Sequence, residues 1–262
     1  MIISHINIPF LKRLIEKFMG KIVTNAYEIY KALVDSYGIK SLSGIIKFRL
    51  GNISVAVRRK EIIGGVLQEW LEQWLKKYDV DFLSNPLMNM PPDIYLDTKD
   101  KTKGWLEIKA FNYDDNPRFS IAYFRTFGDE LIAKPWHLDM DYLIFGYVMH
   151  DETGLIKVQD IWLKKIWEIT KPMSSWPLTV QFKNCVLHEI RPCRWYADKG
   201  NIKVFESKED FLSAFEEALY QNPDTHNAAG LWKNQFRRNY KKHYGKDIRI
   251  PHWEEIMKKY GW

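Results

Sequence analysis

The sequence lacks the short motifs that mark several large enzyme classes. It has no Walker-type phosphate loop, no GxGxxG, no HExxH and no GxSxG, which argues against helicases, metalloproteases and serine hydrolases. Its seven histidines are scattered, and no zinc-finger spacing exists. We therefore expect each histidine to be structural or at the surface, and not a metal ligand.

Cysteine is scarce, because the chain holds only Cys185 and Cys193, with seven residues between them. That spacing fits no metal site, and two cysteines make no disulfide framework, so we expect a protein of the reducing cytoplasm. No apolar run is long enough to span a membrane. Residues 1–23 predict an amphipathic helical extension that starts near Pro9, since charges interrupt its apolar residues and no cleavage site follows.

The composition is that of a folded protein with a sizeable core. Hydrophobic residues make up 46% of the 262 residues, and aromatic residues make up 15%. No repeat, low-complexity segment or flexible linker divides the chain, so residues 24–262 predict a single domain. A net charge of +6 permits a polyanionic partner without requiring one.

Helical and strand-like periodicities follow one another along the chain. Helices are expected at 24–37, 61–78, 118–132, 207–221, 231–244 and 252–260. Strands are expected at 44–50, 53–57, 93–96, 105–111, 141–149, 156–163, 178–182 and 186–190. This pattern predicts an α/β (α+β) fold, in which a central mixed sheet is flanked by helices.

Two of the expected strands carry charged residues in apolar frames. Pro92-Asp93 opens the first strand, and Glu107-Ile108-Lys109 interrupts the second. A polar turn joins the strands, so they predict a hairpin with Asp93 and Glu107 side by side. Two acids that hold a divalent cation, with a lysine that orients water and steadies charge on phosphate, are what metal-dependent phosphodiester hydrolysis requires. The pattern therefore indicates a nuclease.

As a bare pattern this signal is weak, so its context matters. The chain has three acid-x-Lys triplets, of which the first lies in a polar turn and the third opens an expected helix. Only the triplet at 107–109 interrupts an apolar strand. Glu107 and Lys109 could still form the solvent face of an edge strand, and Asp93 could be a turn residue. From the residues alone both interpretations stay open.

At these residues the chain resembles the PD-(D/E)XK nuclease superfamily and, more narrowly, type II restriction endonucleases of the NgoBV/NlaIV kind. The resemblance runs from about Thr24 to near the C-terminus and implies a restriction-endonuclease-like domain over residues 24–262. It rests on the order and spacing of short blocks at 67–71, 92–96, 106–109, 141–145, 161–165 and 190–192.

The resemblance implies a role for each residue of the motif. Asp93 and Glu107 would be the metal-binding carboxylates, and the backbone carbonyl of Ile108 would be a further ligand. Lys109 would face the attacking water. Mg²⁺ is the cofactor that the resemblance implies.

Many members of the superfamily also use an acid from the helix before the first catalytic strand. Glu69 is the best match, because it borders the apolar stripe of the expected helix at 61–78. Glu69 could instead be an ordinary polar residue at the edge of the apolar helix face, without a catalytic role. Glu72 is taken as the solvated counterpart on the same helix.

Side chains in three places are candidates for DNA contacts. The expected helix at 231–244 carries basic residues that suit phosphates, although a solvated helix face is the blander interpretation. The arginines of a second cluster at 191–199 could read guanine edges or brace a loop. A third group follows the catalytic strand. The candidates are Lys233, Arg237, Lys241, Arg191, Arg194, Asn112, Asn116 and Arg118.

The resemblance implies a Mg²⁺-dependent type II restriction endonuclease that cleaves double-stranded DNA at a palindromic site and leaves 5′-phosphate ends. It also implies the interrupted palindrome GGNNCC as the target. Cutting both strands of a palindrome calls for two active sites related by a two-fold axis, so a homodimer is expected. A DNA methyltransferase that protects host DNA is expected in the same system, without a stable complex.

Two alternatives stay open. One is a nuclease of the same superfamily that recognises branched or damaged DNA in repair or recombination. The other is a non-catalytic DNA-binding protein with a decayed site, against which the intact Asp93, Glu107 and Lys109 count. A glycosidase with paired carboxylates is a more distant alternative, and its acids would need no metal.

Overall fold

The computed structural model describes residues 25–87, 90–197 and 202–262. The helical extension expected at 1–23 lies outside the described residues. The chain forms two compact units: one combines the residues up to Asp115 with Asp141–Leu163, and the other combines Asn116–Met140 with Lys164–Trp262. Within the described ranges, no helix has both the length and the apolar character needed to cross a membrane.

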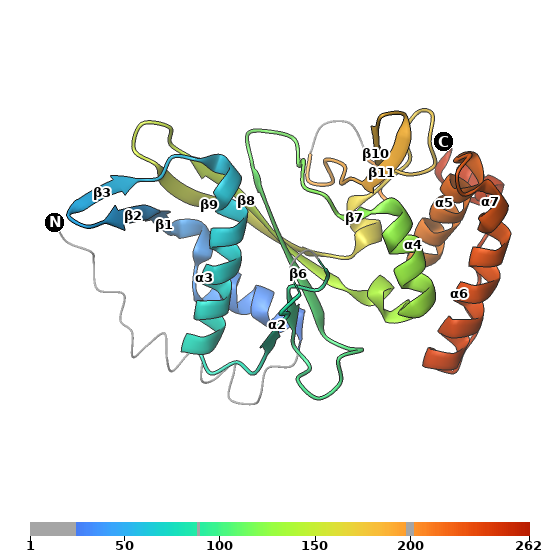
Figure 1. The fold of residues 1–262 in the computed structure, drawn as a ribbon, viewed down its shortest axis with the longest axis horizontal. Helices are drawn as coiled ribbons and strands as arrows, with labels where there is room; N and C mark the ends of the chain where they lie inside the picture. The colour runs from blue at the N-terminus through green and yellow to red at the C-terminus, as the bar shows by residue number, and fades with distance from the viewer. Residues whose placement is uncertain (1–24, 88–89, 198–201) are drawn as a thin grey trace. The chain divides into compact units, whose positions relative to one another are not determined.

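The first unit is built on a six-stranded mixed sheet in the order β1-β9-β8-β6-β5-β4 (Figure 1). β6 runs parallel to β8, while β5 pairs antiparallel with β6 and β1 pairs antiparallel with β9. The expected mixed sheet with flanking helices is therefore confirmed. The strands are β1 (Ser43–Ile45), β4 (Leu83–Ser84), β5 (Ile94–Tyr95), β6 (Trp105–Asn112), β8 (Asp141–Met149) and β9 (Leu155–Lys164).

Two helical segments of the first unit share one core with this sheet. α2 (Ala26–Lys31) continues into a π-helical turn and stops before Gly38, whose φ of 66° suits glycine. α3 (Ile63–Lys77) packs against β6. Both expected helices are confirmed. The core joins side chains of the two helices to alternate residues of the strands, among them Ile29, Leu33, Leu71, Trp74, Leu106, Ile108, Leu143 and Phe145.

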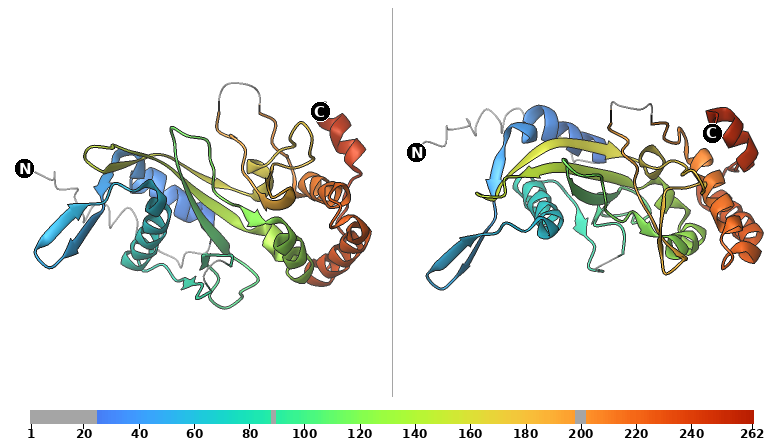
Figure 2. Two further views of the ribbon diagram at one scale, coloured as in Figure 1. Left: turned by 45° about the horizontal axis from the view of Figure 1, so that its top comes forward. Right: turned by 90° about the horizontal axis from the view of Figure 1, so that it is seen from above.

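A separate hairpin stands at the end of β1. It consists of β2 (Lys47–Leu50) and β3 (Ile53–Ala56), which pair antiparallel across the expected Gly51-Asn52 turn. The expected strand at 44–50 is in fact two strands, since β1 pairs with β9 and β2 pairs only with β3. Figure 2 shows the hairpin extending beyond the end of β1 in both views.

Among its described residues, the second unit holds a small sheet in the order β10-β11-β7 and four α-helices. The strands are β7 (Ala122–Tyr123), β10 (Val180–Lys183) and β11 (Val186–Ile190), and the helices are α4 (Phe124–Ala133), α5 (Lys208–Gln221), α6 (Ala229–Tyr244) and α7 (Trp253–Tyr260). Tilted and edge-on aromatic contacts bring α4, α5 and α6 together: Phe124 and Phe127 contact Phe215, which contacts Trp232. Buried Asp210 ties α5 to α7 by accepting a hydrogen bond from the Tyr260 hydroxyl at 2.6 Å.

The helix expected at 118–132 begins only at Phe124, so its first part is wrong. Ala122 and Tyr123 form β7, which pairs with β11. The amide of Ile121 also donates to the carbonyl of Ile190 at 3.0 Å. The spacing of large apolar residues indicated a helix, but pairing with the neighbouring hairpin satisfies the backbone of this segment and outweighs that local preference.

The turn between β5 and β6 should depend on Gly104. This residue has φ of 62°, and a Cβ here would lie 2.8 Å from the amide nitrogen of Asp97. We expect Gly104→Ala to lower the free energy of unfolding by about 2–4 kcal/mol in a denaturant titration. Gly51→Ala is the matched control, because Gly51 has φ of 59° but open space around its Cβ. Equal losses in the two variants would contradict this account.

Candidate active site

The β5–β6 hairpin brings Asp93 and Glu107 together. The register pairs Tyr95 with Trp105 and Ile94 with Leu106, so the next step along the ladder sets Asp93 opposite Glu107. The amide nitrogen of Ile108 donates to Oδ2 of Asp93 at 2.7 Å. The Asp93 side chain, next to β5, thus accepts a hydrogen bond from the backbone of β6. The acid of Pro92-Asp93 and the acid of Glu107-Ile108-Lys109 therefore lie at one site.

Asn85 fixes the backbone that presents Asp93. Its side-chain amide donates to the carbonyls of Met90 and Pro92, both at 2.9 Å. The backbone nitrogen of Asn85 donates to the backbone carbonyl of Asp93 at 2.9 Å. Asn85 carries no charge and stands outside the motif, so its role is not visible in the sequence beyond Asn85-Pro86, a dipeptide typical of turns.

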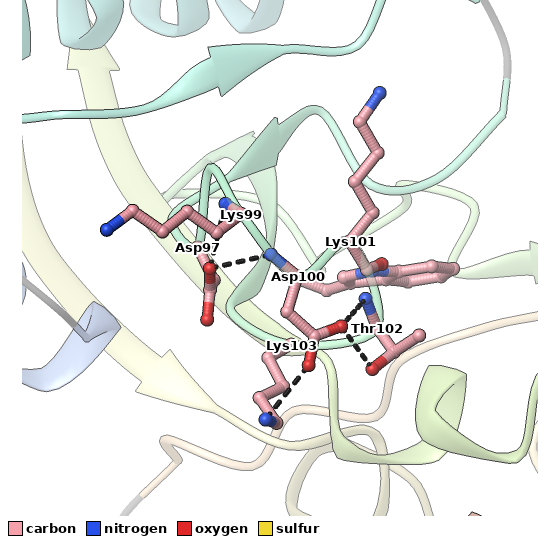
Figure 3. A network of polar contacts seen from close by, with 7 residues as sticks. Asp97, Lys99, Asp100, Lys101, Thr102 and Lys103 are labelled. Atoms are coloured by element: carbon pink, nitrogen blue, oxygen red, sulfur yellow. Dashed lines mark hydrogen bonds and ion pairs between the residues drawn. The ribbon is translucent and has the colours of Figure 1, made fainter.

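The two other acid-x-Lys triplets have structural roles, as their contexts predicted. In the turn after β5, Oδ1 of Asp97 accepts from the amide of Asp100 at 2.8 Å, and Oδ1 of Asp100 accepts from the amide of Thr102 at 3.0 Å. Figure 3 shows how this network closes the turn on itself. The third triplet opens α5, where the Ser207 hydroxyl accepts from the amide of Asp210 at 3.2 Å.

Glu107 is buried and half of its carboxylate has a partner. Strand alternation sends Leu106 and Ile108 into the core and turns Glu107 and Lys109 to the opposite face of β6. Oε1 of Glu107 accepts from Nζ of Lys109 at 2.7 Å. Oε2 is buried without a hydrogen-bond partner among the described residues. A buried, unpartnered carboxylate oxygen is costly and calls for a cation.

Asp93 is electrostatically strained. Burial, followed by the nearby charge of Glu107, raises the pKa of Asp93 to about 7. The Ile108 amide and the charge of Lys109 act in the opposite direction but do not cancel the rise. The two carboxylates have only one lysine between them, so Asp93 is partly protonated near neutral pH, and a bound cation would displace that proton.

Glu69 stays a prediction as the helix acid, and the structure adds a second candidate on the same helix, Glu72. Glu72 is half-buried, its Oε2 accepts from the Ser84 hydroxyl at 2.7 Å, and its charge contributes to the raised pKa of Asp93. Glu69 is exposed on α3. Periodicity identifies the residues that border an apolar stripe, but it does not say which border faces the strands. In α3 that border carries Glu72.

The donor set fits a small oxygen-preferring cation. Within the described part of the chain, no group of three or more His, Cys, Asp or Glu side chains is arranged to hold a metal. Asp93 and Glu107 remain, with the backbone carbonyl of Ile108 as the further ligand that the sequence resemblance implies. One or two carboxylates with waters is the usual protein environment of Mg²⁺. The unpartnered Oε2 of Glu107 and the raised pKa of Asp93 both favour such an ion.

The candidate DNA-contacting residues fall in both units. In the first, Asn112 ends β6, and its side-chain amide donates to Asp115 at 2.8 Å. In the second, Asn116, Arg118 and Arg194 are exposed. Arg191 forms an ion pair with Glu189 and hydrogen bonds with the carbonyl of Arg118 and the side chain of Gln181. Arg191 therefore braces β11 and the segment before β7, as the loop interpretation expected.

The basic residues of α6 do not form one free face. Lys233 is half-buried and forms an ion pair with buried Glu216 at 2.8 Å. Lys241 is exposed and forms an ion pair with Asp247, also at 2.8 Å. Arg237 is exposed. Leaving Glu216 without a partner would be costly, so the contact gives Lys233 a structural role in holding α6 to α5.

Comparison with known proteins relates the chain to restriction enzymes. The NgoBV restriction endonuclease family matches residues 23–260. The type II restriction enzyme NlaIV of Neisseria lactamica is 47% identical over 236 residues, which cover 90% of this chain and 97% of the relative. The type II restriction enzyme NgoBV of Neisseria gonorrhoeae is 38% identical over 158 residues, covering 60% and 89%. A solved structure of NlaIV restriction endonuclease matches with a TM-score of 0.85 and 45% identity, over 90% of this chain and 96% of that one.

The raised pKa of Asp93 should make the free energy of unfolding depend on pH. The pKa of Asp93 is raised from 3.8 to about 7 in the folded protein. Ionised Asp93 therefore lowers the free energy of unfolding, and this loss grows as the pH rises from about 4 to 7. At pH 8 without metal, we expect Asp93→Asn to raise the free energy of unfolding by roughly 1–3 kcal/mol, and the gain should vanish near pH 4. Asp97→Asn, in the turn, should give no such gain. Loss of stability in Asp93→Asn at pH 8 would contradict the assignment.

Proposed function

We propose that this chain, which belongs to the NgoBV restriction endonuclease family, cleaves double-stranded DNA with Asp93, Glu107 and Lys109 at its reactive centre and Mg²⁺ as cofactor. The chain is a type II site-specific deoxyribonuclease. The observation that carries the residue assignment is the hydrogen bond from Ile108 to Asp93, which joins the two halves of the motif in one site. We assign catalysis and DNA binding to residues 24–262.

The protein groups of this centre have distinct tasks. Asp93 and Glu107, with the Ile108 carbonyl, would hold Mg²⁺, which when bound lowers the pKa of water and stabilises charge on phosphate. Nζ of Lys109 can donate three hydrogen bonds, and Glu107 accepts one at 2.7 Å. The remaining two suit a water molecule and a phosphate oxygen. Glu107 thereby orients Lys109 while both stay on the same face of β6.

Recognition and products are proposed from the family. The target is a palindrome, GGNNCC, and hydrolysis leaves 5′-phosphate ends. Two copies of the chain act on the two strands, and a methyltransferase of the same specificity protects host DNA. Exposed residues are the best-placed DNA contacts, and they are Asn116, Arg118, Arg194, Arg237 and Lys241, with Asn112 three residues beyond Lys109 at the end of β6.

Digestion of a long, sequenced, unmethylated duplex tests the assignment. With Mg²⁺ we expect discrete bands that disappear with excess chelator and whose ends map to GGNNCC. Lys109→Ala should reduce the cleavage rate at least about 100-fold, the usual cost of losing a group that orients water and stabilises transition-state charge.

Lys99→Ala is the matched control, because Lys99 is the lysine of the acid-x-Lys triplet in the turn. It should cleave at the rate of the unaltered protein. Equal loss of activity in the two variants, or full activity in Lys109→Ala, would contradict the assignment of Lys109. Discrete bands at another sequence would retain the chemistry and reject only GGNNCC.

A further inference from the structure

Positive charge is concentrated in one short stretch of the first unit. Residues 47–60, here called the basic arm, comprise the β2–β3 hairpin and the segment that follows it. The arm holds five basic residues and no acidic residue, a charge of +5, whereas the whole chain of 262 residues has a net charge of +6. The basic residues are Lys47, Arg49, Arg58, Arg59 and Lys60.

Most of these cations face solvent without an acidic partner. All except Lys60 are exposed. Among the described residues no acid lies within ion-pair distance of the exposed four, whereas Lys60 pairs with Asp151 at 3.3 Å. By contrast, three of the basic DNA-contact candidates in the second unit are paired with acids. A cluster of unpaired cations attracts a polyanion, and DNA is the polyanion on which this enzyme class acts.

The tip of the hairpin is apolar. Leu50 and Ile53 are register partners on either side of the Gly51-Asn52 turn, and they are 73% and 67% exposed. Proteins that bind the minor groove of DNA often insert apolar side chains such as Leu or Ile between base steps, with cations beside them. The arm combines both kinds of side chain, so its tip has a use on DNA that it lacks in water.

The sheet fixes where the arm begins relative to the reactive centre. Ile45, the last residue of β1, pairs with Leu155, which directly follows the turn between β8 and β9. Glu107 pairs with Tyr142 near the other end of β8, and the strand from there to Met149 spans roughly 23 Å. The hairpin then extends beyond β1 (Figure 2). Its cations thus lie on the order of 30 Å from the centre, close to the roughly 34 Å of one turn of duplex.

We propose that the basic arm grips double-stranded DNA outside the target sequence, about one helical turn (~34 Å) from the bond that the same chain cleaves. The proposal rests on the proposed function, in which the first unit holds the Asp93–Glu107–Lys109 centre. The four exposed cations bind phosphates, and Leu50 and Ile53 enter the minor groove. Phosphate contacts carry no sequence information, so the arm adds affinity for flanking DNA and leaves the choice of target unchanged.

Binding of the full-length protein to a labelled duplex of about 40 base pairs, in excess chelator, tests the arm without cleavage. Lys47→Ser with Arg49→Ser should weaken binding at least about tenfold and lower the slope of log K against log salt by about 2, since each phosphate contact contributes about 0.9. Leu50→Ser with Ile53→Ser should weaken binding and leave the slope unchanged, because it removes no charge.

Two matched variants control this experiment. Lys76→Ser with Lys77→Ser removes the same charge from exposed lysines of α3 and should bind as the unaltered protein does. Lys47→Arg with Arg49→Lys keeps the charge of the arm and should also bind normally. An arm variant that binds no more weakly than the α3 variant would overturn the proposal. Unchanged affinity in Leu50→Ser with Ile53→Ser would overturn the role of the tip.

Cleavage of two duplexes with Mg²⁺ locates the contact. A duplex of about 12 base pairs with the target at its centre reaches only about 20 Å to either side, less than the distance of the arm. Lys47→Ser with Arg49→Ser should raise KM at least about tenfold, with kcat unchanged, on about 40 base pairs but not on about 12. An equal rise on both lengths would overturn the proposal. Failure of the unaltered protein to cleave either duplex would reject the proposed function, while the metal-free binding assay would still decide the arm.

Discussion

The hydrogen bond from the Ile108 amide to Asp93 is the contact on which the reactive centre depends. It ties the residue just before β5 to β6 at the point where each segment carries an acid. Asn85 holds the same stretch from the other side through the carbonyls of Met90 and Pro92. Because β6 also pairs in parallel with β8 along its length, Glu107 and the amide that holds Asp93 lie within the paired part of the sheet.

The centre is built at the expense of stability. Glu107 is only 8% exposed, one of its oxygens has no hydrogen-bond partner in the described part of the protein, and burial with the charge of Glu107 raises the pKa of Asp93 to about 7. Lys109 offsets part of this negative charge but not all of it. A site with surplus buried negative charge attracts a divalent cation, and the same strain makes the metal-free protein less stable than its packing would allow.

The sequence could predict what local chemistry dictates. The polar turn between two apolar strands identified the hairpin with Asp93 and Glu107, and the Ser207 cap identified the start of α5. It could not predict choices between partners distant in the chain. The segment before Phe124 pairs with β11 instead of extending α4, and α3 turns Glu72 and not Glu69 toward Ser84. The exposure of Phe48 and Leu50 was equally hidden, since a strand that alternates apolar and basic residues predicts a covered face.

The central claim is that Asp93 and Glu107 jointly hold a divalent cation, which displaces the proton that Asp93 carries near neutral pH. Calorimetric titration of the protein with Mg²⁺, in two buffers of different ionisation enthalpy, counts the protons released. Because the pKa of Asp93 is raised to about 7, more protons should leave per cation at pH 7 than at pH 8.5, and Asp93→Asn should abolish the release. Binding heats that are independent of the buffer at pH 7, or binding that survives unchanged in Asp93→Asn, would contradict the account.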